Sequence, residues 1–293
     1  MSHELISIAP PYACGIREDR SRVDFDEAAW PAPPPWAAAY AARQRVGRER
    51  MAASRAVLCG LARDTEAQLP LNLARIRRIG RHFADHRIVV YENDSVDGTR
   101  KILDEAALRD PRVRVLGQPD GTPHWPPVRD RARTEQLARY RERVRRAVVD
   151  RHGDFDLVIV ADFDLEGWSY EGIADALGHD GWDAMASTGV RFFGGRPFFY
   201  DGFAFRAHGH PEPHAPFELR AMLLPRGAPP VRVDSAFSGL AIYAMKAFAA
   251  GRYEGHDCEH ATFHASLRAA GFGRAFLNPS MLSLYPDFGE DLR

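Results

Sequence analysis

Asp156-Leu157-Val158-Ile159-Val160-Ala161-Asp162-Phe163-Asp164 is the stretch that decides the fold. A run of apolar, mostly β-branched residues leads directly into two carboxylates spaced two positions apart, which is typical of a fully buried strand that ends at a solvent-facing edge. In an open parallel α/β sheet, ligands bind outside the carboxyl ends of the strands. Asp162 and Asp164 are therefore predicted to hold a divalent cation on a diphosphate. The alternative is that either aspartate only caps the following turn.

The composition narrows the class of protein. The chain has 293 residues, 45% of them hydrophobic and 27% charged, as in a globular enzyme near the upper size of one domain. A formal net charge of -1 argues against a protein that coats nucleic acid, so no nucleic-acid partner is expected. The three cysteines, at positions 14, 59 and 258, form no Cys-x-x-Cys pair and suit a reducing compartment.

The sequence shows no signal peptide and no run of about 18 apolar residues, so no membrane span is predicted. A cytoplasmic protein is therefore expected, with peripheral attachment to the inner face of the membrane as the alternative. The arginine-rich segment 129–146 is interpreted as the solvated face of a helix, with a membrane or polyanion contact as the second interpretation.

Residues 1–54 are predicted to form a proline-rich arm and a helix, and residues 55–293 a single catalytic domain. The run Trp30-Pro31-Ala32-Pro33-Pro34-Pro35-Trp36 favours extended backbone, and the helix is expected over 37–53. Trp30 and Trp36 are interpreted as anchors of the arm on its own domain, with docking to a partner as the alternative.

Beyond residue 55 the pattern alternates between short apolar strands and amphipathic helices. Strands are expected at 56–62, 87–91, 113–116, 157–161, 182–187, 231–234 and 239–243, with a last one from 275. Helices are expected at 69–83, 100–108, 129–151, 169–177 and 245–250, with another that carries His264. In the helix over 129–151, Leu137, Tyr140, Val144 and Val148 make the inward stripe. This alternation with short connections predicts a mainly parallel, Rossmann-like sheet flanked by helices.

Polar clusters follow three of the predicted strands, and parallel strands place their carboxyl ends at one edge. The clusters are Arg63-Asp64, Glu92-Asn93-Asp94-Ser95 and Asp162-x-Asp164. We expect their side chains to face one cleft. The first two could bind a base and a ribose, Asp162 and Asp164 could bind Mn²⁺ or Mg²⁺, and Arg133 could add positive charge from the long helix.

The C-terminal half supplies further candidates. The segment 191–206 is dense in aromatic residues and glycine, and flat aromatic faces suit sugar rings, although an apolar cluster under a loop has the same composition. We assign Tyr200, Asp201, Ser238 and Gly239 to sugar and acceptor binding. Asp257 and Glu259 are the candidate catalytic carboxylates, with helix capping as the alternative, and His264 or His260 is the candidate third metal ligand.

The order of these motifs resembles the GT-A class of glycosyltransferases. More narrowly, three stretches are similar to the fungal capsule-associated α-1,3-mannosyltransferase family: 91–99, 199–206 and Asp257-Cys258-Glu259-His260. The resemblance covers residues 55–285. It implies transfer of a hexose, mannose from GDP-mannose, to a sugar hydroxyl of a glycan or glycolipid, with retention at the anomeric carbon. A UDP-hexose is the alternative donor.

The stereochemistry decides the role of the carboxylates at 257 and 259. If the enzyme inverts, Asp257 or Glu259 is expected to be the general base; if it retains, both are expected to position the acceptor.

Two other classes of protein fit parts of the sequence. A phosphatase of the haloacid dehalogenase type also places Asp-x-Asp after a strand, with Asp287, Asp291 and Lys246 as its further motifs. A noncatalytic sugar-binding protein on a transferase fold has the same residue pattern.

Overall fold

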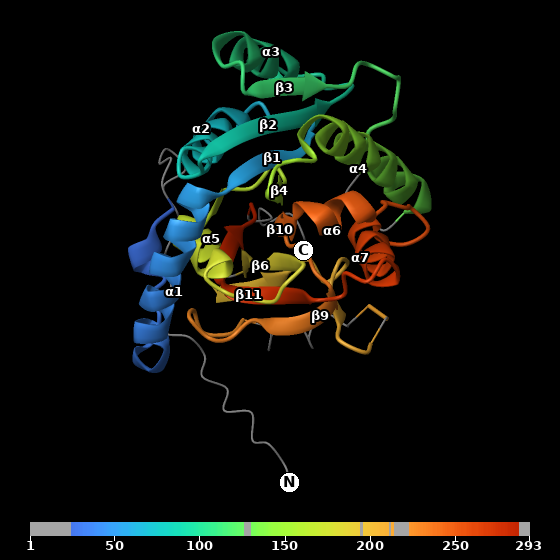
Figure 1. Ribbon diagram of the computed structural model, residues 1–293. Helices are drawn as coiled ribbons and strands as arrows, with labels where there is room; N and C mark the ends of the chain where they lie inside the picture. The colour runs from blue at the N-terminus through green and yellow to red at the C-terminus, as the bar shows by residue number, and fades with distance from the viewer. Residues whose placement is uncertain (1–24, 126–129, 194–195, 211, 214–222, 287–293) are drawn as a thin grey trace.

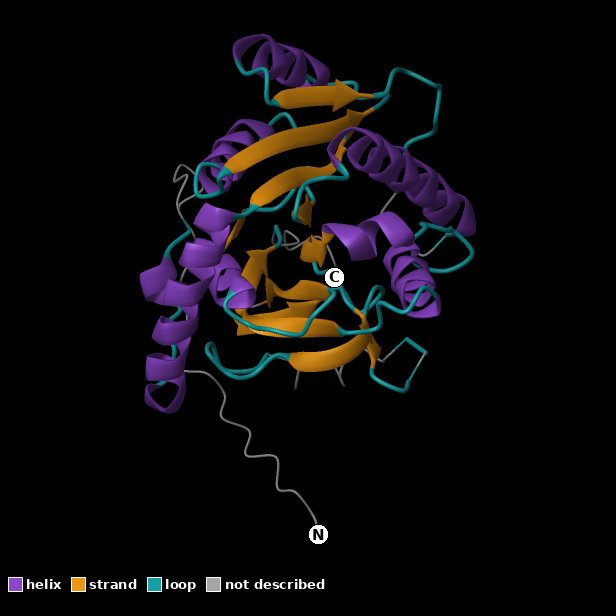
Figure 2. Ribbon diagram, viewed as in Figure 1, coloured by secondary structure: helices purple, strands orange, loops and turns teal. Residues whose placement is uncertain are grey.

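The computed structural model describes residues 25–125, 130–193, 196–210, 212–213 and 223–286. Helices lie on both sides of one central sheet (Figures 1 and 2). The helices are η1 (Glu27–Ala29), α1 (Pro34–Ala53), α2 (Leu69–Gly80), α3 (Thr99–Arg109), α4 (Arg131–His152), α5 (Tyr170–Leu177), α6 (Met245–Ala250) and α7 (Glu259–Ala269). The strands are β1 (Arg55–Ala62), β2 (Asp85–Glu92), β3 (Val113–Leu116), β4 (Leu157–Ala161), β5 (Gly167–Trp168), β6 (Ala184–Phe193), β7 (Arg196–Tyr200), β8 (Arg206–Ala207), β9 (Val231–Ser235), β10 (Leu240–Ala244) and β11 (Ala275–Leu284).

The sheet has the strand order β3-β2-β1-β4-β10-β6-β11-β9-β8, with β5 paired to β11 and β7 paired to β6. The first four strands are parallel to one another, and β10 runs antiparallel to both β4 and β6. Since β11 is parallel to β6, the strands β1, β2, β3, β4, β6 and β11 all point the same way. Their carboxyl ends therefore meet at one edge, where β10 begins.

The central strands are apolar at nearly every position because both of their faces are buried. In β1, Val57 and Cys59 belong to one core, while Ala56 and Leu58 belong to the other. Residues of α4, α6 and α7 complete the first core, and residues of α2, α3 and α5 complete the second. Figure 1 shows these two groups of helices on opposite sides of the sheet. The predicted mainly parallel sheet flanked by helices is confirmed.

The N-terminal helix packs backbone to backbone on α5. A Cβ at Gly47 of α1 would lie 1.7 Å from the carbonyl oxygen of Ala174, so only glycine permits this approach. Arg43 donates to Asp175 of α5 at 2.7 Å. Trp30 is 3% exposed and packs against Phe192, as expected for an anchor of the arm. The predicted division at residue 54 stays a prediction, and residues 1–24 of the arm lie outside the described residues.

Two expectations from the sequence need correction. The first helix begins at Pro34 rather than at residue 37, because proline is tolerated in the first turn, where its missing N–H has no helical partner. The strand expected over 182–187 extends to Phe193 and turns back into β7, so the aromatic segment is a hairpin of the sheet. Within the described residues, no helix combines the length and the apolar character that a bilayer crossing requires.

Candidate functional site

A cavity of about 790 Å³ opens at the carboxyl edge of the parallel strands. The ends of β1, β4 and β11 line it, together with the N-terminal half of α4, the start of α7 and the segment after β7. Its volume falls within the range of small-molecule sites, about 300–1,000 Å³. Among the described residues its lining includes five carboxylates (Asp64, Asp162, Asp164, Asp201 and Glu259) and four arginines (Arg63, Arg133, Arg141 and Arg191). The cavity therefore suits a polar, charged ligand.

Asp162 and Asp164 both line this cavity, immediately after β4. Phe163 between them is 1% exposed and packs in the second core. The side-chain amide of Asn72 on α2 donates to the carbonyl oxygens of Phe163 and Leu165, both at 2.8 Å. This clamp fixes the turn after the strand, so that its two carboxylates face the cavity while its apolar residue is buried.

The electrostatics of the pair favour a bound cation. The protein around the carboxylate of Asp164 and the negative charge of Asp162 both disfavour its ionisation and raise its pKa to about 6, although the residue remains exposed to solvent. Burial also raises the pKa of Asp162, although Arg141 opposes the shift. The carboxylate of Asp164 accepts no hydrogen bond from another residue within the described part of the chain. Asp162 and Asp164 thus offer two carboxylate ligands, both with a raised pKa. They fit Mg²⁺ or Mn²⁺, since Mg²⁺ is often held by one or two carboxylates plus substrate phosphates.

His264 does not join the two aspartates, which corrects its assignment as the third metal ligand. Its side chain is 2% exposed, its Nε2 lies 3.2 Å from the hydroxyl of Tyr243, and it is not among the residues that line the cavity. Burial lowers its pKa to about 3. His260, one turn earlier, does line the cavity and stacks on Phe237 at 3.6 Å. Within the described part of the chain, no group of three or more His, Cys, Asp or Glu residues is arranged to hold a metal.

The predicted nucleotide-binding residues divide into two groups. Arg63, Arg133 and Asp162 line the cavity. Glu92, Asp94 and Ser95 do not, and they bind neighbouring backbone instead, which corrects the expectation that they face the cleft.

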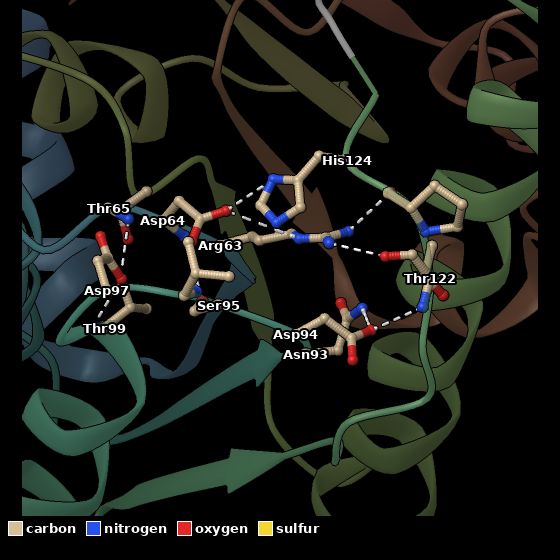
Figure 3. A network of polar contacts seen from close by, with 12 residues as sticks. Arg63, Asp64, Thr65, Asn93, Asp94, Ser95, Asp97, Thr99, Thr122 and His124 are labelled. Carbon is tan, nitrogen blue, oxygen red and sulfur yellow. Dashed lines mark hydrogen bonds and ion pairs between the residues drawn. The ribbon is translucent and has the colours of Figure 1, made fainter.

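The second group shapes the loops around the cavity. Glu92 accepts from the amide of Ser95 at 3.1 Å, and the hydroxyl of Ser95 accepts from the amide of Asp64 at 3.1 Å. Asp94 accepts from the amides of Asp120, Gly121 and Thr122 at 3.0–3.1 Å. Figure 3 shows how Arg63 reaches the same loop, donating to the carbonyl of Thr122 at 2.8 Å.

The predicted sugar-binding residues also divide. Tyr200 and Asp201 line the cavity, whereas Ser238 and Gly239 are buried behind them. The amide of Ser238 donates to Asp201 Oδ2 at 2.9 Å. Asp201 and Ser238 have φ values of 84° and 55°, a left-handed conformation that costs non-glycine residues energy and is common at binding sites. Ser238 therefore supports Asp201, and the carbonyl of Gly239 accepts from the amide of Asp162 at 2.8 Å; neither residue is among those that line the cavity.

Asp201 has an unusual charge environment. Burial is the largest cause that raises its pKa to about 7, and the charges of Asp162 and Glu259 add to it, while the Ser238 amide opposes the shift. Asp201 forms no ion pair with any described residue. It is thus a carboxylate that a hydroxyl donor in the cavity could reach.

The two predicted catalytic carboxylates lie in different places. Asp257 is outside the cavity lining, and its exposed carboxylate binds Arg206 at 2.8 Å. The expectation that it faces the reacting groups is therefore wrong, because the chain turns it away from the cavity before α7 begins. Glu259, the first residue of α7, does line the cavity and accepts from Arg141 Nε at 3.0 Å.

Arg141 is the residue that the sequence interpretation missed. Its Nη2 donates to Asp162 at 2.9 Å, its Nε donates to Glu259, and its side chain is 8% exposed. The interpretation of segment 129–146 as a solvated face is therefore wrong at this position. The available signal was its spacing, since residue 141 falls on the inward stripe between Leu137 and Val144.

No protein-family model and no curated protein matches the chain. Solved structures do match. A mannosyltransferase from Pyrobaculum calidifontis, solved with GDP-Man and Mn²⁺, is 12% identical over 85% of this chain and 65% of its own, with a TM-score of 0.47. GalNAc-T7, solved with UDP, GalNAc and Mn²⁺, is 12% identical over 82% of this chain and 45% of its own, with a TM-score of 0.51. TarS from S. aureus, solved with UDP-GlcNAc, is 13% identical over 80% of this chain and 59% of its own, with a TM-score of 0.48.

The fold of this chain is that of the GT-A glycosyltransferases. The chain spans less than two thirds of the length of each of these three proteins. The narrower resemblance to the fungal capsule-associated family stays a prediction.

Proposed function

We propose that the protein is a glycosyltransferase that moves a hexose from a nucleotide-diphosphate sugar to a hydroxyl group of a glycan or glycolipid. The observation that carries the proposal is the pair Asp162 and Asp164, which follows β4 at the carboxyl edge of a GT-A sheet and faces a cavity of about 790 Å³. Cavities at this edge are the usual ligand sites of such sheets.

Each wall of the cavity has a proposed task. Asp162 and Asp164 would hold Mn²⁺ or Mg²⁺, and that cation, when bound, would offset the negative charge of the diphosphate. Arg63 and Arg133 place further positive charge on the donor side. Tyr200 offers a flat ring to a sugar, as expected from the aromatic segment.

On the acceptor side, Asp201 would accept a hydrogen bond from the reacting hydroxyl. The amide of Ser238 binds its Oδ2 at 2.9 Å, so the hydroxyl would be oriented by a carboxylate that is already held by the backbone.

The finer assignment follows the family resemblance: the donor is GDP-mannose, with a UDP-hexose as the alternative, and the sugar is transferred with retention. Retention rests on the resemblance, and the contacts of Glu259 and Asp257 are compatible with it. Glu259 is bound to Arg141, and Asp257 is bound to Arg206 outside the cavity. A retaining transfer requires no general base at either position. The predicted cytoplasmic location, with peripheral attachment to the membrane as its alternative, belongs to the same proposal, as does a role in polysaccharide biosynthesis.

The phosphatase alternative finds less support. Its lysine, Lys246, follows β10, whose Ala244 end pairs with Leu157 at the edge opposite the cavity. Asp287 and Asp291 lie outside the described residues. The noncatalytic alternative is separated from the transferase by the experiment below.

The test is a thermal-unfolding screen of the protein with Mn²⁺ and a panel of nucleoside diphosphates and nucleotide sugars, followed by assay of diphosphate release. We expect a metal-dependent stabilisation by GDP or UDP that disappears in Asp162→Ala and Asp164→Ala. The matched control is Asp104→Ala, which removes an exposed carboxylate on α3. A protein indifferent to every nucleotide contradicts the proposal, binding without sugar transfer indicates the noncatalytic alternative, and hydrolysis of a generic phosphate ester indicates a phosphatase.

A further inference from the structure

We propose that Arg141 is a positioning residue that joins the donor side of the cavity to its acceptor side, and that Glu259 acts through Arg141 and not as a general base. The proposal rests on the proposed transferase function, because it assigns roles within the same site. No described residue other than Arg141 binds both Asp162 and Glu259.

The contacts of Arg141 connect three separate elements. The guanidinium comes from the middle of α4 and donates to Asp162 Oδ1, just after β4, at 2.9 Å. It also donates to Glu259 Oε1, the first residue of α7, at 3.0 Å. A guanidinium offers its donors in a fixed, planar fork, so one side chain sets the direction of both carboxylates.

The packing around the guanidinium restricts it further. The Cζ of Arg141 lies 5.0 Å from the centre of the Phe237 ring, and His260 also stacks on that ring, at 3.6 Å. Phe237 and His260 both line the cavity. Because the ring and the two carboxylates leave the arginine little freedom, Asp162 and Glu259 are held in place before a ligand arrives.

This arrangement does not have the features of one kept for stability alone. Arg141 Nη1 is buried and has no hydrogen-bond partner among the described residues. Buried ion pairs with unsatisfied groups generally stabilise a fold no better than apolar side chains of similar volume. The buried arginine is better explained by what it does to the two carboxylates.

Two consequences follow for the site. One oxygen of Asp162 is used by Arg141, whereas no described residue donates to Oδ2, which is left for a ligand. Oε1 of Glu259 is already bound by the guanidinium of Arg141, so this oxygen is not free to accept from an acceptor hydroxyl. Arg141 thereby fixes the orientation of the Asp162 carboxylate in the cavity wall, where it would hold a cation that offsets the charge of a diphosphate.

The first experiment compares Arg141→Met, Arg141→Lys and the control Arg145→Met. Arg145 lies one turn along α4; its side chain is 13% exposed and is also bound to a carboxylate, Glu142, but it does not line the cavity. Calorimetry measures the affinity for Mn²⁺ and for GDP or UDP, whichever stabilises the unaltered protein. Changing a residue that orients a metal ligand typically weakens metal binding by about 10–100-fold.

We therefore expect Arg141→Met to weaken the joint binding of Mn²⁺ and nucleotide by at least about tenfold, with Arg141→Lys in between and Arg145→Met within about twofold of the unaltered protein. Arg141→Met leaves Asp162 and Glu259 without the positive charge between them, and their repulsion could unfold the protein. The double variant Arg141→Met/Glu259→Gln removes that repulsion and is measured alongside. If either folded Arg141→Met variant binds as tightly as the unaltered protein, the inference is overturned. If the unaltered protein binds no nucleotide, the proposed function fails instead.

The second experiment addresses Glu259. We expect Glu259→Gln to keep sugar transfer within about tenfold and to leave the pH profile unchanged, because the amide still accepts from Arg141. Loss of a general base would lower the rate by about 10²–10⁴-fold and remove the basic limb of the profile. That result would make Glu259 the base and overturn the inference.

Discussion

Asp94 gives the sharpest test of the geometry around the cavity, because its position in the sequence suggests contact with the donor while its contacts in the structure are with backbone. Its carboxylate accepts from three successive amides, at Asp120, Gly121 and Thr122, and from the side-chain amide of Asn93 at 2.8 Å. The loop that these bonds fix leads to His124 and Trp125, which line the cavity. Figure 3 shows the bond to Thr122 next to the contact that Arg63 makes with the same loop.

The expected effect of Asp94→Ala follows from these bonds. A carboxylate that caps one or two amides is worth about 0.5–2 kcal/mol, and Asp94 caps three. The freed amides lie in an exposed loop and regain water, so the loss stays well below the sum of three charged hydrogen bonds. We expect Asp94→Ala to lower the free energy of unfolding by about 2 kcal/mol, which lowers Tm by about 3 °C in a chain of 293 residues. Asp94→Asn keeps one acceptor oxygen and should lose about half as much.

The effect should depend on pH with a definite sign. Burial alone would raise the pKa of Asp94, but the hydrogen bonds from Asn93, Gly121 and Thr122 outweigh it and hold the pKa well below its usual range. The stabilisation is therefore complete above the pKa of an unfolded aspartate, about 3.9. It is lost as the pH falls from there through the pKa of the folded state, so the difference between the two proteins should vanish in strong acid.

Thermal unfolding and hydrogen exchange at the amides of 120–122 measure the prediction, with Asp104→Ala as a surface control expected to stay within about 0.5 kcal/mol. An Asp94→Ala protein with an unchanged Tm and full amide protection would refute the reasoning. If that protein also lost nucleotide affinity, Asp94 would contact the donor directly, as its sequence position suggests.

Three further predictions concern other parts of the molecule. Gly47→Ala should lower the free energy of unfolding by about 1–3 kcal/mol in denaturant titrations, since its Cβ would lie 1.7 Å from the oxygen of Ala174 and the helices must move apart. Asp257→Asn should leave nucleotide affinity within about twofold in calorimetry, because this carboxylate binds Arg206 outside the cavity. Cys59 should resist alkylation at pH 8 until the protein unfolds, since burial raises its pKa to about 12 and leaves almost no thiolate; rapid labelling of the folded protein would contradict this.

The sequence predicted the sheet and the place of the acidic pair after β4 because both depend on local patterns. An apolar run followed by Asp162 and Asp164 specifies a buried strand and a polar end, and the parallel direction of the strands then places their carboxyl ends at one edge. The same reasoning failed for Glu92, Asp94 and Ser95. Carboxylates and hydroxyls that accept from loop amides have the same residue types, at the same strand end, as those that bind a ligand. Whether these residues bind loop amides or a ligand depends on the path of the loop at 117–125.

The histidines of α7 show a second limit of sequence-based prediction: the sequence does not tell which turn of a helix meets the cavity. His260 and His264 are four residues apart and lie on nearly the same face of the helix, so periodicity treats them alike. Each residue adds about 1.5 Å along the axis, which moves His264 about 6 Å further from the start of the helix. That distance takes it from the cavity wall to the core beside Tyr243. The sequence therefore identified the helix, but not which of its turns meets the cavity.

Arg141 shows how such a residue can be found. The inward stripe of α4 runs through Leu137, Val144 and Val148, and a guanidinium within it must be paired or it would cost several kcal/mol. Its partners must then be carboxylates at the edge where α4 meets the sheet. The aspartate pair after β4 and the acidic start of α7 are the candidates that the sequence already placed there. A single arginine in the apolar stripe thus indicates that the aspartate pair after β4 lies close to the acidic start of α7. Neither motif indicates this contact by itself.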